Sequence, residues 1–159
     1  MSSSPDQANQ PTAAGIFFDR MLDVDFRRQH QVRFRDTDAS GFVHYTNYIR
    51  MMEETEYAFL RSLNLCIVML DEKGVFGFPR RSCEVQIHEP ACLNDPLETW
   101  LQIDFCDGVK IGYRFEINRA SDVIATGKFV LACCRFSPGQ PPKAILIPDS
   151  FLNRFPQKQ

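Results

Sequence analysis

The clearest pattern along the chain is an apolar stripe with helical spacing between residues 45 and 64. Its members fall within one arc when each residue is advanced by about 100°. They are Tyr45, Tyr48, Ile49, Met52, Phe59, Leu60 and Leu63. Glu56 lies in the middle of this arc and Glu53 at its margin, so we expect the Glu56 carboxylate to find a partner, to reach solvent or to face an internal pocket. The stripe predicts one long helix.

Alternating apolar and polar positions predict strands on both sides of this helix. Residues 25–36 alternate Phe26, His30, Val32 and Phe34 with arginine and glutamine, which is typical of an edge or half-exposed strand. After the helix, four runs are rich in Val, Ile, Phe, Tyr, Thr and Cys and are separated by turn residues. These predicted strands cover residues 78–89, 97–106, 110–119 and 123–136.

The remaining segments are shorter or less regular. We expect a turn at residues 37–41 and a partly helical connection at 66–73, because the first is rich in turn residues and the second has no clear period. A loop is expected at 137–144, and short docked helices at 17–22 and 149–155. Residues 1–15 are rich in Ser, Pro, Gln, Asn and Ala and are expected to form a disordered N-terminal tail.

One strand, one long helix and a four-strand meander predict an α+β domain over residues 16–159. An antiparallel sheet of about five strands buries a single central helix only if the sheet curls around it. The outer face of such a sheet then keeps apolar positions, which favours association with a second copy of the chain.

The net charge of the chain limits the classes of ligand that it is expected to bind. Among 159 residues, 18 are Lys or Arg and 20 are Asp or Glu, giving a net charge of -2. This balance predicts no broad attraction to nucleic acid or to an anionic membrane, while a small basic pocket for one phosphorylated ligand remains open. Residues 1–15 lack the features of a signal peptide and no stretch is long and apolar enough to span a membrane, so we expect a cytoplasmic protein.

The cysteines and histidines do not form a metal-binding pattern. The six cysteines show no C-x-x-C spacing and the three histidines are far apart, so we expect no metal site. We expect reduced and mostly buried thiols, with adjacent Cys133 and Cys134 on opposite faces of a strand.

The candidate chemistry lies where the first strand passes into the helix. Two carboxylates, Asp36 and Asp38, stand with Thr37, Ser40 and Gly41 just before the first backbone amides of the helix. Those amides have no intrahelical partner, and the helix dipole adds positive potential there. Such a junction suits chemistry on a carbonyl or on a phosphate.

The motif Asp-Thr-Asp-x-x-Gly-x-Val-x-x-x-x-Tyr, from Asp36 to Tyr48, precedes the helix and the four-strand meander. In this context it resembles the hotdog-fold acyl-CoA thioesterases of the 4-hydroxybenzoyl-CoA thioesterase family. The similarity extends over residues 26–155 and includes 74–79, 82–83 and 94–95. It implies a hotdog fold, hydrolysis of an acyl-CoA thioester to free acid and coenzyme A, a homodimer or homotetramer, and no cofactor other than the coenzyme A of the substrate.

The resemblance also implies roles for single residues. Asp38 would attack the thioester carbonyl or activate a water as general base. The backbone N–H of Tyr45 would stabilise the oxyanion, a contribution of about 3 kcal/mol. Asp36 is expected to be structural. Expected substrate contacts near the turn are Gly41, Val43, His44, Asn47 and Tyr48. The hairpin at residues 106–110 lacks the Arg/Lys cluster that some members use to bind the coenzyme A phosphates, and we expect Arg80, Arg81, Lys110 and Arg114 to take its place.

Two departures from the family pattern bear on specificity and on the core. Some relatives have histidine at the position of Tyr45, whereas the members that act on aromatic acyl groups have tyrosine there, as this chain does. This residue therefore favours aromatic or bulky substrates. The helix carries Glu53 and Glu56 in place of the family's Glu-x-x-Arg pair, so an internal ion pair within the helix is not expected.

Three other functions are compatible with parts of this sequence. Asp36 resembles the nucleophile of haloacid-dehalogenase-like phosphatases, but Arg33 and Arg35 beside Phe34 do not fit the buried strand that precedes that motif. A hotdog protein that binds acyl-CoA or an acyl carrier without hydrolysis is a second alternative. A hotdog dehydratase is a third and needs a histidine base, for which His44 is the nearby candidate.

Overall fold

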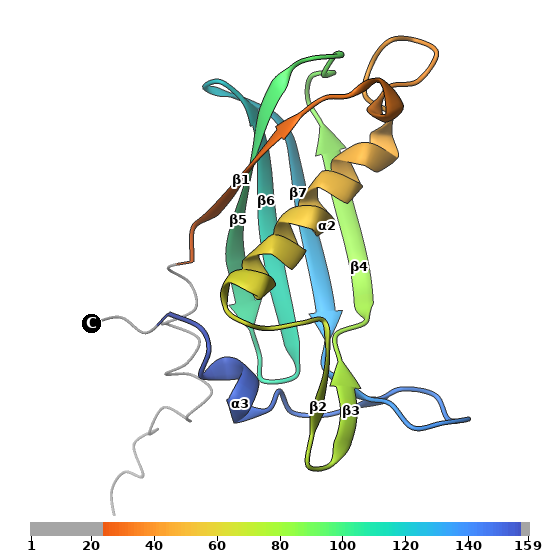
Figure 1. Cartoon of the computed structure of the whole chain (residues 1–159), viewed down its shortest axis with the longest axis vertical. Coiled ribbons are helices and arrows are strands. Elements are labelled where there is room, and N and C mark those ends of the chain that lie inside the picture. Colours follow the sequence, from red (N-terminus) through yellow and green to blue (C-terminus); the bar gives the residue numbers. More distant parts are fainter. Residues whose placement is uncertain (1–23, 157–159) are drawn as a thin grey trace, which may run out of the picture.

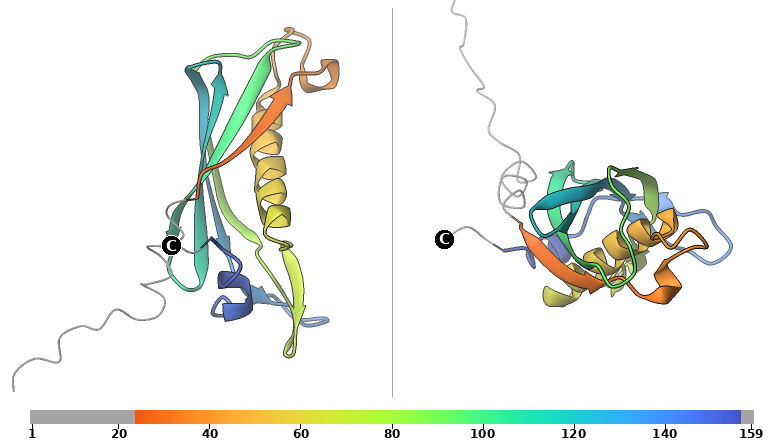
Figure 2. Two further views of the ribbon diagram at one scale, coloured as in Figure 1. Left: turned by 60° about the vertical axis from the view of Figure 1, so that its left-hand side comes forward. Right: turned by 90° about the horizontal axis from the view of Figure 1, so that it is seen from above.

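The computed structural model describes residues 24–156 and has a five-stranded antiparallel sheet wrapped around one long helix (Figure 1). The strand order is β1-β5-β6-β7-β4, so β1 and β4 are the two edges. Seen from above, the sheet curves around the helix (Figure 2). The predicted hotdog architecture is confirmed. The main elements are β1 (Phe26–Gln31), α2 (Tyr45–Ser62), β4 (Arg80–Ile87), β5 (Pro96–Cys106), β6 (Lys110–Arg119) and β7 (Asp122–Ala132).

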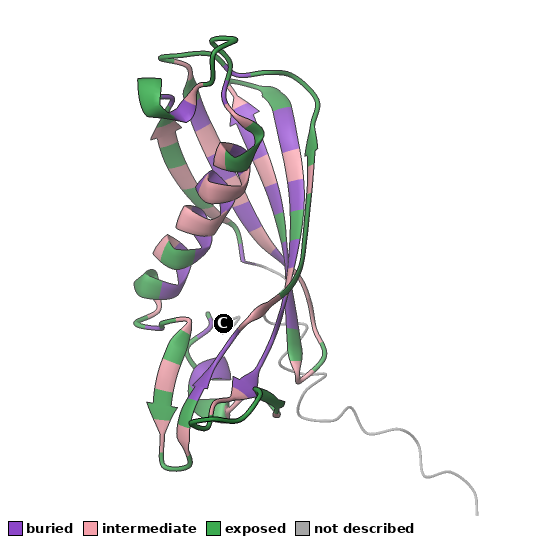
Figure 3. Cartoon of the chain, turned by 90° about the vertical axis from the view of Figure 1, so that its right-hand side faces the viewer, coloured by how far each residue is buried: buried purple, intermediate pink, exposed green. Residues whose placement is uncertain are grey.

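Helix α2 follows the predicted stripe and ends two residues before its predicted end. Its buried face carries Tyr48, Met51, Met52, Thr55, Glu56, Phe59 and Leu60. Gly127 on β7 lets this face approach the sheet closely, because a Cβ there would lie 2.4 Å from the Met52 Sδ. Figure 3 shows the buried positions of α2 and of the strands on the faces that meet. Within residues 24–156, no helix has the length and apolar content that spanning a bilayer requires.

The predicted first strand is shorter than expected. β1 ends at Gln31, and Phe34–Asp36 form a 3-10 helix, η1. The reason is local, since the Asp36 carboxylate accepts the Arg33 N–H at 2.8 Å and closes the chain into a turn. The edge position predicted for this strand is confirmed by its pairing with β5 alone.

A second, smaller sheet extends beyond the end of α2. Its order is β2-β3-β8-β9, formed by β2 (Val68–Asp71), β3 (Gly74–Gly77), β8 (Cys134–Arg135) and β9 (Lys143–Ala144). The prediction of a partly helical segment at 66–73 was wrong, because β2 and β3 form a hairpin. Arg135 stabilises that hairpin through the Asp71 carboxylate, at 2.6 and 2.9 Å, and the Gly74 carbonyl, at 2.7 Å.

The C-terminal predictions need smaller corrections. The strand predicted at 123–136 is interrupted at Cys133, which separates β7 from β8, and β9 lies within the predicted loop. The final helix α3 spans Asp149–Leu152 and packs its Phe151 ring 4.5 Å from the Phe78 ring, measured between centroids. The predictions for residues 1–15 and 17–22 lie outside the described residues.

The cysteines are free, and most are not buried in the single chain. Only Cys133 and Cys134 are buried, while Cys106 is half-buried and Cys66, Cys83 and Cys92 are exposed. The expectation of mostly buried thiols was therefore wrong. Cys83 lies on edge strand β4, and Cys92 lies in the loop that follows it, so neither side chain is covered within one chain.

Candidate active site

Asp36 joins the end of the first strand to the start of α2. Its buried carboxylate accepts the Arg33 N–H at 2.8 Å and pairs with the Arg50 guanidinium. Its carbonyl accepts the His44 N–H at 2.9 Å and the Asn47 Nδ2–H at 2.8 Å. The structural role predicted for Asp36 is confirmed. Asn47 and His44, expected to contact substrate, are thereby tied to the turn.

The turn that carries Asp38 is closed by its own backbone. The Asp38 N–H donates to the Phe42 carbonyl at 2.9 Å, and the Gly41 N–H donates to the Asp38 carbonyl at 3.0 Å. Gly41 has φ +83°, a left-handed conformation that glycine adopts without the steric cost of a Cβ. The chain therefore reverses at Gly41 and presents Asp38 at the surface.

Ser40 holds one oxygen of the Asp38 carboxylate. The Asp38 Oδ1 accepts the Ser40 N–H at 2.8 Å and also the Ser40 hydroxyl. The hydroxyl bond is the main cause of the lowered pKa of Asp38. Among the described residues no donor bonds to Oδ2, and the side chain is exposed. Asp38 is thus an ionised carboxylate at neutral pH, with one oxygen oriented and the other available for reaction.

The start of α2 follows this turn directly. His44 is the N-cap residue, and its Nδ1 accepts the Thr46 N–H at 3.4 Å and lies 2.8 Å from the Thr46 hydroxyl. The Tyr45 N–H belongs to the first helical turn, and within residues 24–156 no protein group accepts it. The Tyr45 side chain is exposed, with its ring centroid 4.6 Å from that of His44. The first turn of α2 therefore offers a donor next to the Asp38 turn.

Val43 and Tyr48, which were expected to contact substrate, form hydrogen bonds inside the protein. The Val43 N–H donates to the Ala91 carbonyl at 2.8 Å, and the Tyr48 hydroxyl accepts the Ala91 N–H at 2.9 Å. Both side chains are buried, and burial raises the pKa of Tyr48. They fix the turn and the helix start to the loop after β4. Their burial does not support direct substrate contact.

Arg80 has an internal role, and its expected contact with the coenzyme A phosphates stays a prediction. Its Nη2 donates to the Glu56 Oε2 at 2.9 Å and to the Glu53 Oε1 at 3.3 Å, and its guanidinium carbon lies 4.1 Å from the centre of the Phe129 ring. Burial raises the pKa of Glu56 despite this partner. The prediction that Glu56 finds a hydrogen-bond partner is confirmed. The partner comes from β4, so an internal ion pair exists although the helix lacks the family's arginine.

The other predicted phosphate contacts do not converge on Asp38 within one chain. Arg81 and Lys110 are exposed at the starts of β4 and β6, at the end of the sheet opposite the start of α2 (Figure 1). Arg114 is exposed along β6 and donates to the Gln102 Oε1 at 2.8 Å. Their contact with coenzyme A stays a prediction.

Histidine and metal chemistry find little support at this site. Among residues 24–156 no hydrogen bond joins His44 to Asp38, and no group of three His, Cys, Asp or Glu side chains is arranged to hold a metal ion. The pairing of histidine with aspartate that a dehydratase requires is therefore not formed in this part of the chain.

Ser40 was placed in the turn by the sequence, but its contact with the Asp38 carboxylate was not predicted. An aspartate followed two residues later by a serine is a pattern in which the carboxylate accepts the backbone N–H at position i+2. That signal was present in Asp38-Ala39-Ser40, and the structure adds the hydroxyl bond to the same oxygen.

Known proteins are similar to this chain over most of its length. The family model described as Thioesterase-like superfamily matches residues 32–155. The acyl-CoA thioester hydrolase YbgC of Escherichia coli is 28% identical over 132 residues, which cover 83% of this chain and 96% of that protein. The 1,4-dihydroxy-2-naphthoyl-CoA hydrolase of Synechococcus elongatus is 26% identical over 113 residues, covering 69% of this chain and 82% of that protein.

A solved structure shares the fold. The 1,4-dihydroxy-2-naphthoyl-CoA thioesterase of Synechocystis superposes with a TM-score of 0.72 at 21% identity, covering 83% of this chain and 96% of its own. At this level of identity the likeness establishes the fold, and activity has to be argued from the site.

Proposed function

Because this chain belongs to the thioesterase-like superfamily, we propose that it hydrolyses an acyl-CoA thioester to the free acid and coenzyme A. Relatives named for this type of reaction support the proposal and align over most of their own length. The observation that carries it is the Asp38 carboxylate, ionised and oriented by Ser40 in the turn before the Tyr45 N–H, which has no acceptor among residues 24–156. As proposed, the reaction needs no cofactor beyond the coenzyme A of the substrate.

In the proposed reaction, the Asp38 carboxylate and the start of α2 have different roles. The Asp38 Oδ2 attacks the thioester carbonyl carbon, and the C–S bond breaks as coenzyme A leaves, which produces a mixed anhydride that water then hydrolyses. Alternatively, Asp38 removes a proton from a water that attacks the same carbon. In both routes the carbonyl oxygen gains negative charge, and the Tyr45 N–H with the dipole of α2 stabilises that charge.

A second copy of the chain is proposed to complete the site. Asp38 is exposed in one chain, and so are the neighbouring aromatic side chains of Phe42 (42%) and Tyr45 (62%). A hydrolase needs a pocket that encloses the acyl group and limits water. Among the described residues, edge strand β4 pairs only with β7, and Phe42 bridges to Cys92 in the loop after β4. A homodimer or larger homo-oligomer that covers this edge would also enclose Asp38.

Aromatic acyl groups are the proposed substrates. The exposed Tyr45 ring beside the Asp38 turn offers a stacking surface, and relatives that act on 1,4-dihydroxy-2-naphthoyl-CoA point the same way. A panel of aromatic, short aliphatic and long aliphatic acyl-CoAs, compared by kcat/KM, tests this choice. Faster hydrolysis of the aliphatic compounds would contradict it.

Release of free thiol from acyl-CoA tests the activity itself. Wild type should release coenzyme A steadily, and Asp38→Asn should lose about three orders of magnitude in kcat because it removes the reacting carboxylate. Asp122→Asn is the matched control, since Asp122 is an exposed aspartate at the start of β7. Binding of acyl-CoA without thiol release would instead identify a non-hydrolytic binding protein, and equal turnover in Asp38→Asn would remove Asp38 from its role.

The two chemical routes differ in where oxygen from water enters. A single turnover in heavy-oxygen water places the label in the Asp38 carboxylate if a mixed anhydride forms, because water can open the anhydride at the aspartyl carbon. Label in the Asp38 carboxylate therefore identifies the anhydride route, whereas label only in the product acid is expected both for the general-base route and for an anhydride that water opens at the acyl carbon. Mass spectrometry of the peptide that contains Asp38 makes the distinction.

We also propose a cytoplasmic location. All six cysteines are free, and three of them are exposed. Unpaired, exposed thiols fit a reducing compartment, where disulfides rarely persist. Localisation of the full chain by cell fractionation tests this, and a predominantly extracytoplasmic signal would contradict it.

A further inference from the structure

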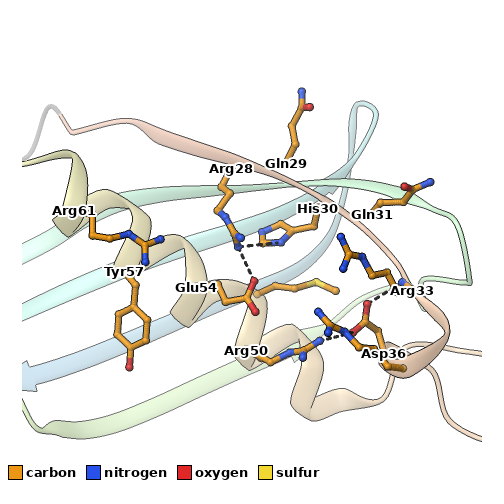
Figure 4. A pocket seen from close by; sticks show the side chains of 12 residues that line it. Arg28, Gln29, His30, Gln31, Arg33, Asp36, Arg50, Glu54, Tyr57 and Arg61 are labelled. Carbon is orange, nitrogen blue, oxygen red and sulfur yellow. Dashed lines mark hydrogen bonds and ion pairs between the residues drawn. The ribbon is translucent and has the colours of Figure 1, made fainter. Parts of the chain in front are cut away.

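An arginine-rich groove lies between β1, η1 and one side of α2, separate from the Asp38 carboxylate (Figure 4). It is a concave cavity of about 460 Å³. Asp38 is not among the residues that line it. Five of the lining residues are arginines: Arg28, Arg33, Arg35, Arg50 and Arg61.

The groove has more positive than negative charge. Its lining contains two carboxylates, Asp36 and Glu54, against the five guanidinium groups. Glu54 pairs with Arg28 at 2.7 Å, and Asp36 pairs with Arg50. Three positive charges therefore remain without a full counter-charge, on a chain whose net charge is -2.

Two of the arginines have no acidic partner. Among residues 24–156, no carboxylate lies within 4.0 Å of the guanidinium groups of Arg33 or Arg61. The Arg33 side chain enters the groove from the residue before η1 and the Arg61 side chain from the last turn of α2, and they are seen at opposite ends of the groove in Figure 4. The Nε of Arg50 is buried and has no acceptor in the described part of the chain. The groove thus holds donors that lack protein acceptors.

His30 adds no negative group to balance this charge. Its Nδ1 lies 3.4 Å from the Arg28 Nη1 and its Nε2 lies 3.3 Å from the Thr55 hydroxyl, which itself donates to the Met51 carbonyl at 2.7 Å. Arg28 can only donate, so Nδ1 accepts and the imidazole is neutral with its proton on Nε2. Burial lowers the pKa of His30 to about 4, in agreement with this assignment.

We propose that this groove binds a phosphate or pyrophosphate group at the end where Arg33 and Arg50 lie. Guanidinium groups form paired, charge-assisted hydrogen bonds to phosphate oxygens, and a concave site with several arginines favours a multiply charged anion over a single carboxylate. Two carriers present this chemistry, namely the nucleotide end of coenzyme A and a free phosphorylated metabolite. Binding here is independent of whether Asp38 hydrolyses a thioester.

Titration of the full chain with inorganic pyrophosphate at constant ionic strength tests the site. Isothermal calorimetry should give saturable binding to wild type. Arg33→Gln should weaken it about tenfold, the effect of losing one charge-assisted contact, whereas Arg61→Gln, at the other end of the groove, should weaken it less. Neither change strips a carboxylate of its partner, so the fold should survive. Arg27→Gln is the matched control, because Arg27 lies next to Arg28 on β1, outside the groove, and pairs with Asp25.

Two results would overturn the proposal. One is the absence of saturable binding at millimolar pyrophosphate, and the other is unchanged affinity in Arg33→Gln. The titration measures binding and not hydrolysis, so its result does not depend on the thiol-release assay. The proposed phosphate site and the proposed thioesterase activity can therefore be contradicted independently.

Further measurements identify the carrier. If the groove holds the nucleotide end of coenzyme A, then adenosine 3′,5′-bisphosphate should displace pyrophosphate, and Arg33→Gln should raise KM for an acyl-CoA but not for the matching acyl-pantetheine. If the carrier is a free metabolite, Arg33→Gln should lose pyrophosphate binding while KM for acyl-CoA stays unchanged. Either outcome supports a phosphate site, and they differ only in what the site holds.

Discussion

The Arg80 guanidinium on β4 donates to the Glu56 carboxylate of α2 at 2.9 Å, where the helix packs against the sheet. Glu56 is fully buried, whereas Arg80 keeps partial contact with solvent and a second carboxylate partner, Glu53. The pair lets a helix with a carboxylate in the middle of its apolar stripe pack against the sheet.

Removing Glu56 should therefore destabilise the fold more than removing Glu53. Glu56→Ala leaves Arg80 with one exposed partner and creates a small cavity, and should lower the free energy of unfolding by about 2–3 kcal/mol. Glu53→Ala is the control and should cost less than about 1 kcal/mol, because its side chain is more exposed. Urea unfolding measures both, and equal losses would contradict the assigned role of the buried pair.

His30 should make the free energy of unfolding depend on pH. Its pKa is about 4 in the folded chain and 6.5 without perturbation, so the unfolded chain binds more protons between these values. Stability is then fully present above pH 6.5 and falls as pH drops toward 4. Because His30 is only partly buried, we expect about 1–2 kcal/mol of this loss to come from it.

His30→Gln should reduce the loss of stability between pH 6.5 and 4, while His88→Gln, at an exposed histidine on the other side of the chain, should leave it unchanged. The urea midpoint followed across this pH range is the measurement. Parallel curves for wild type and His30→Gln would rule out His30 as the source.

Ser40 should influence the pH below which kcat/KM falls. Its hydroxyl lowers the pKa of Asp38, so in Ser40→Ala the carboxylate should remain protonated to a higher pH. The acid limb of kcat/KM should shift to higher pH, because only the ionised carboxylate reacts. Ser82→Ala, at an exposed serine on β4, serves as the control. An unshifted limb in Ser40→Ala would mean that another group titrates there.

Tyr48 should act through stability and not through substrate binding. Tyr48→Phe keeps the ring but leaves the buried Ala91 N–H without its acceptor, and should cost about 1–3 kcal/mol. Tyr57→Phe loses an exposed bond to Glu53 and should cost less. Urea unfolding gives the stabilities, and KM for acyl-CoA should stay close to wild type in both. A large rise in KM for Tyr48→Phe alone would restore the substrate contact predicted from sequence.

Edge strand β4 should control assembly and, with it, activity. Light scattering should give at least twice the chain mass of 18.3 kDa for wild type. Ile87→Lys places a charge at this edge and should shift the population to monomer and lower turnover in parallel. Val123→Lys, at a comparably exposed position at the start of β7, should do neither. A monomeric wild type with full activity would contradict the shared site.

Local pattern was sufficient for much of the fold. The period of the apolar stripe predicted α2 within two residues, and β6 begins and ends where its alternation predicts. The motif from Asp36 to Tyr48 also located the turn and the helix start. These features depend on neighbours in the chain, whose spacing is visible in the sequence.

The partners of polar groups were decided by tertiary structure. Glu56 and Arg80 are 24 residues apart, and only the packing of α2 against β4 brings them together. The arginines of the groove come from β1, η1 and α2, so their accumulation has no counterpart in any single stretch of sequence. The β2–β3 hairpin likewise depends on Arg135, which is 64 residues from Asp71. Periodicity determines which face of an element is apolar, but strand order and helix placement determine which charges meet.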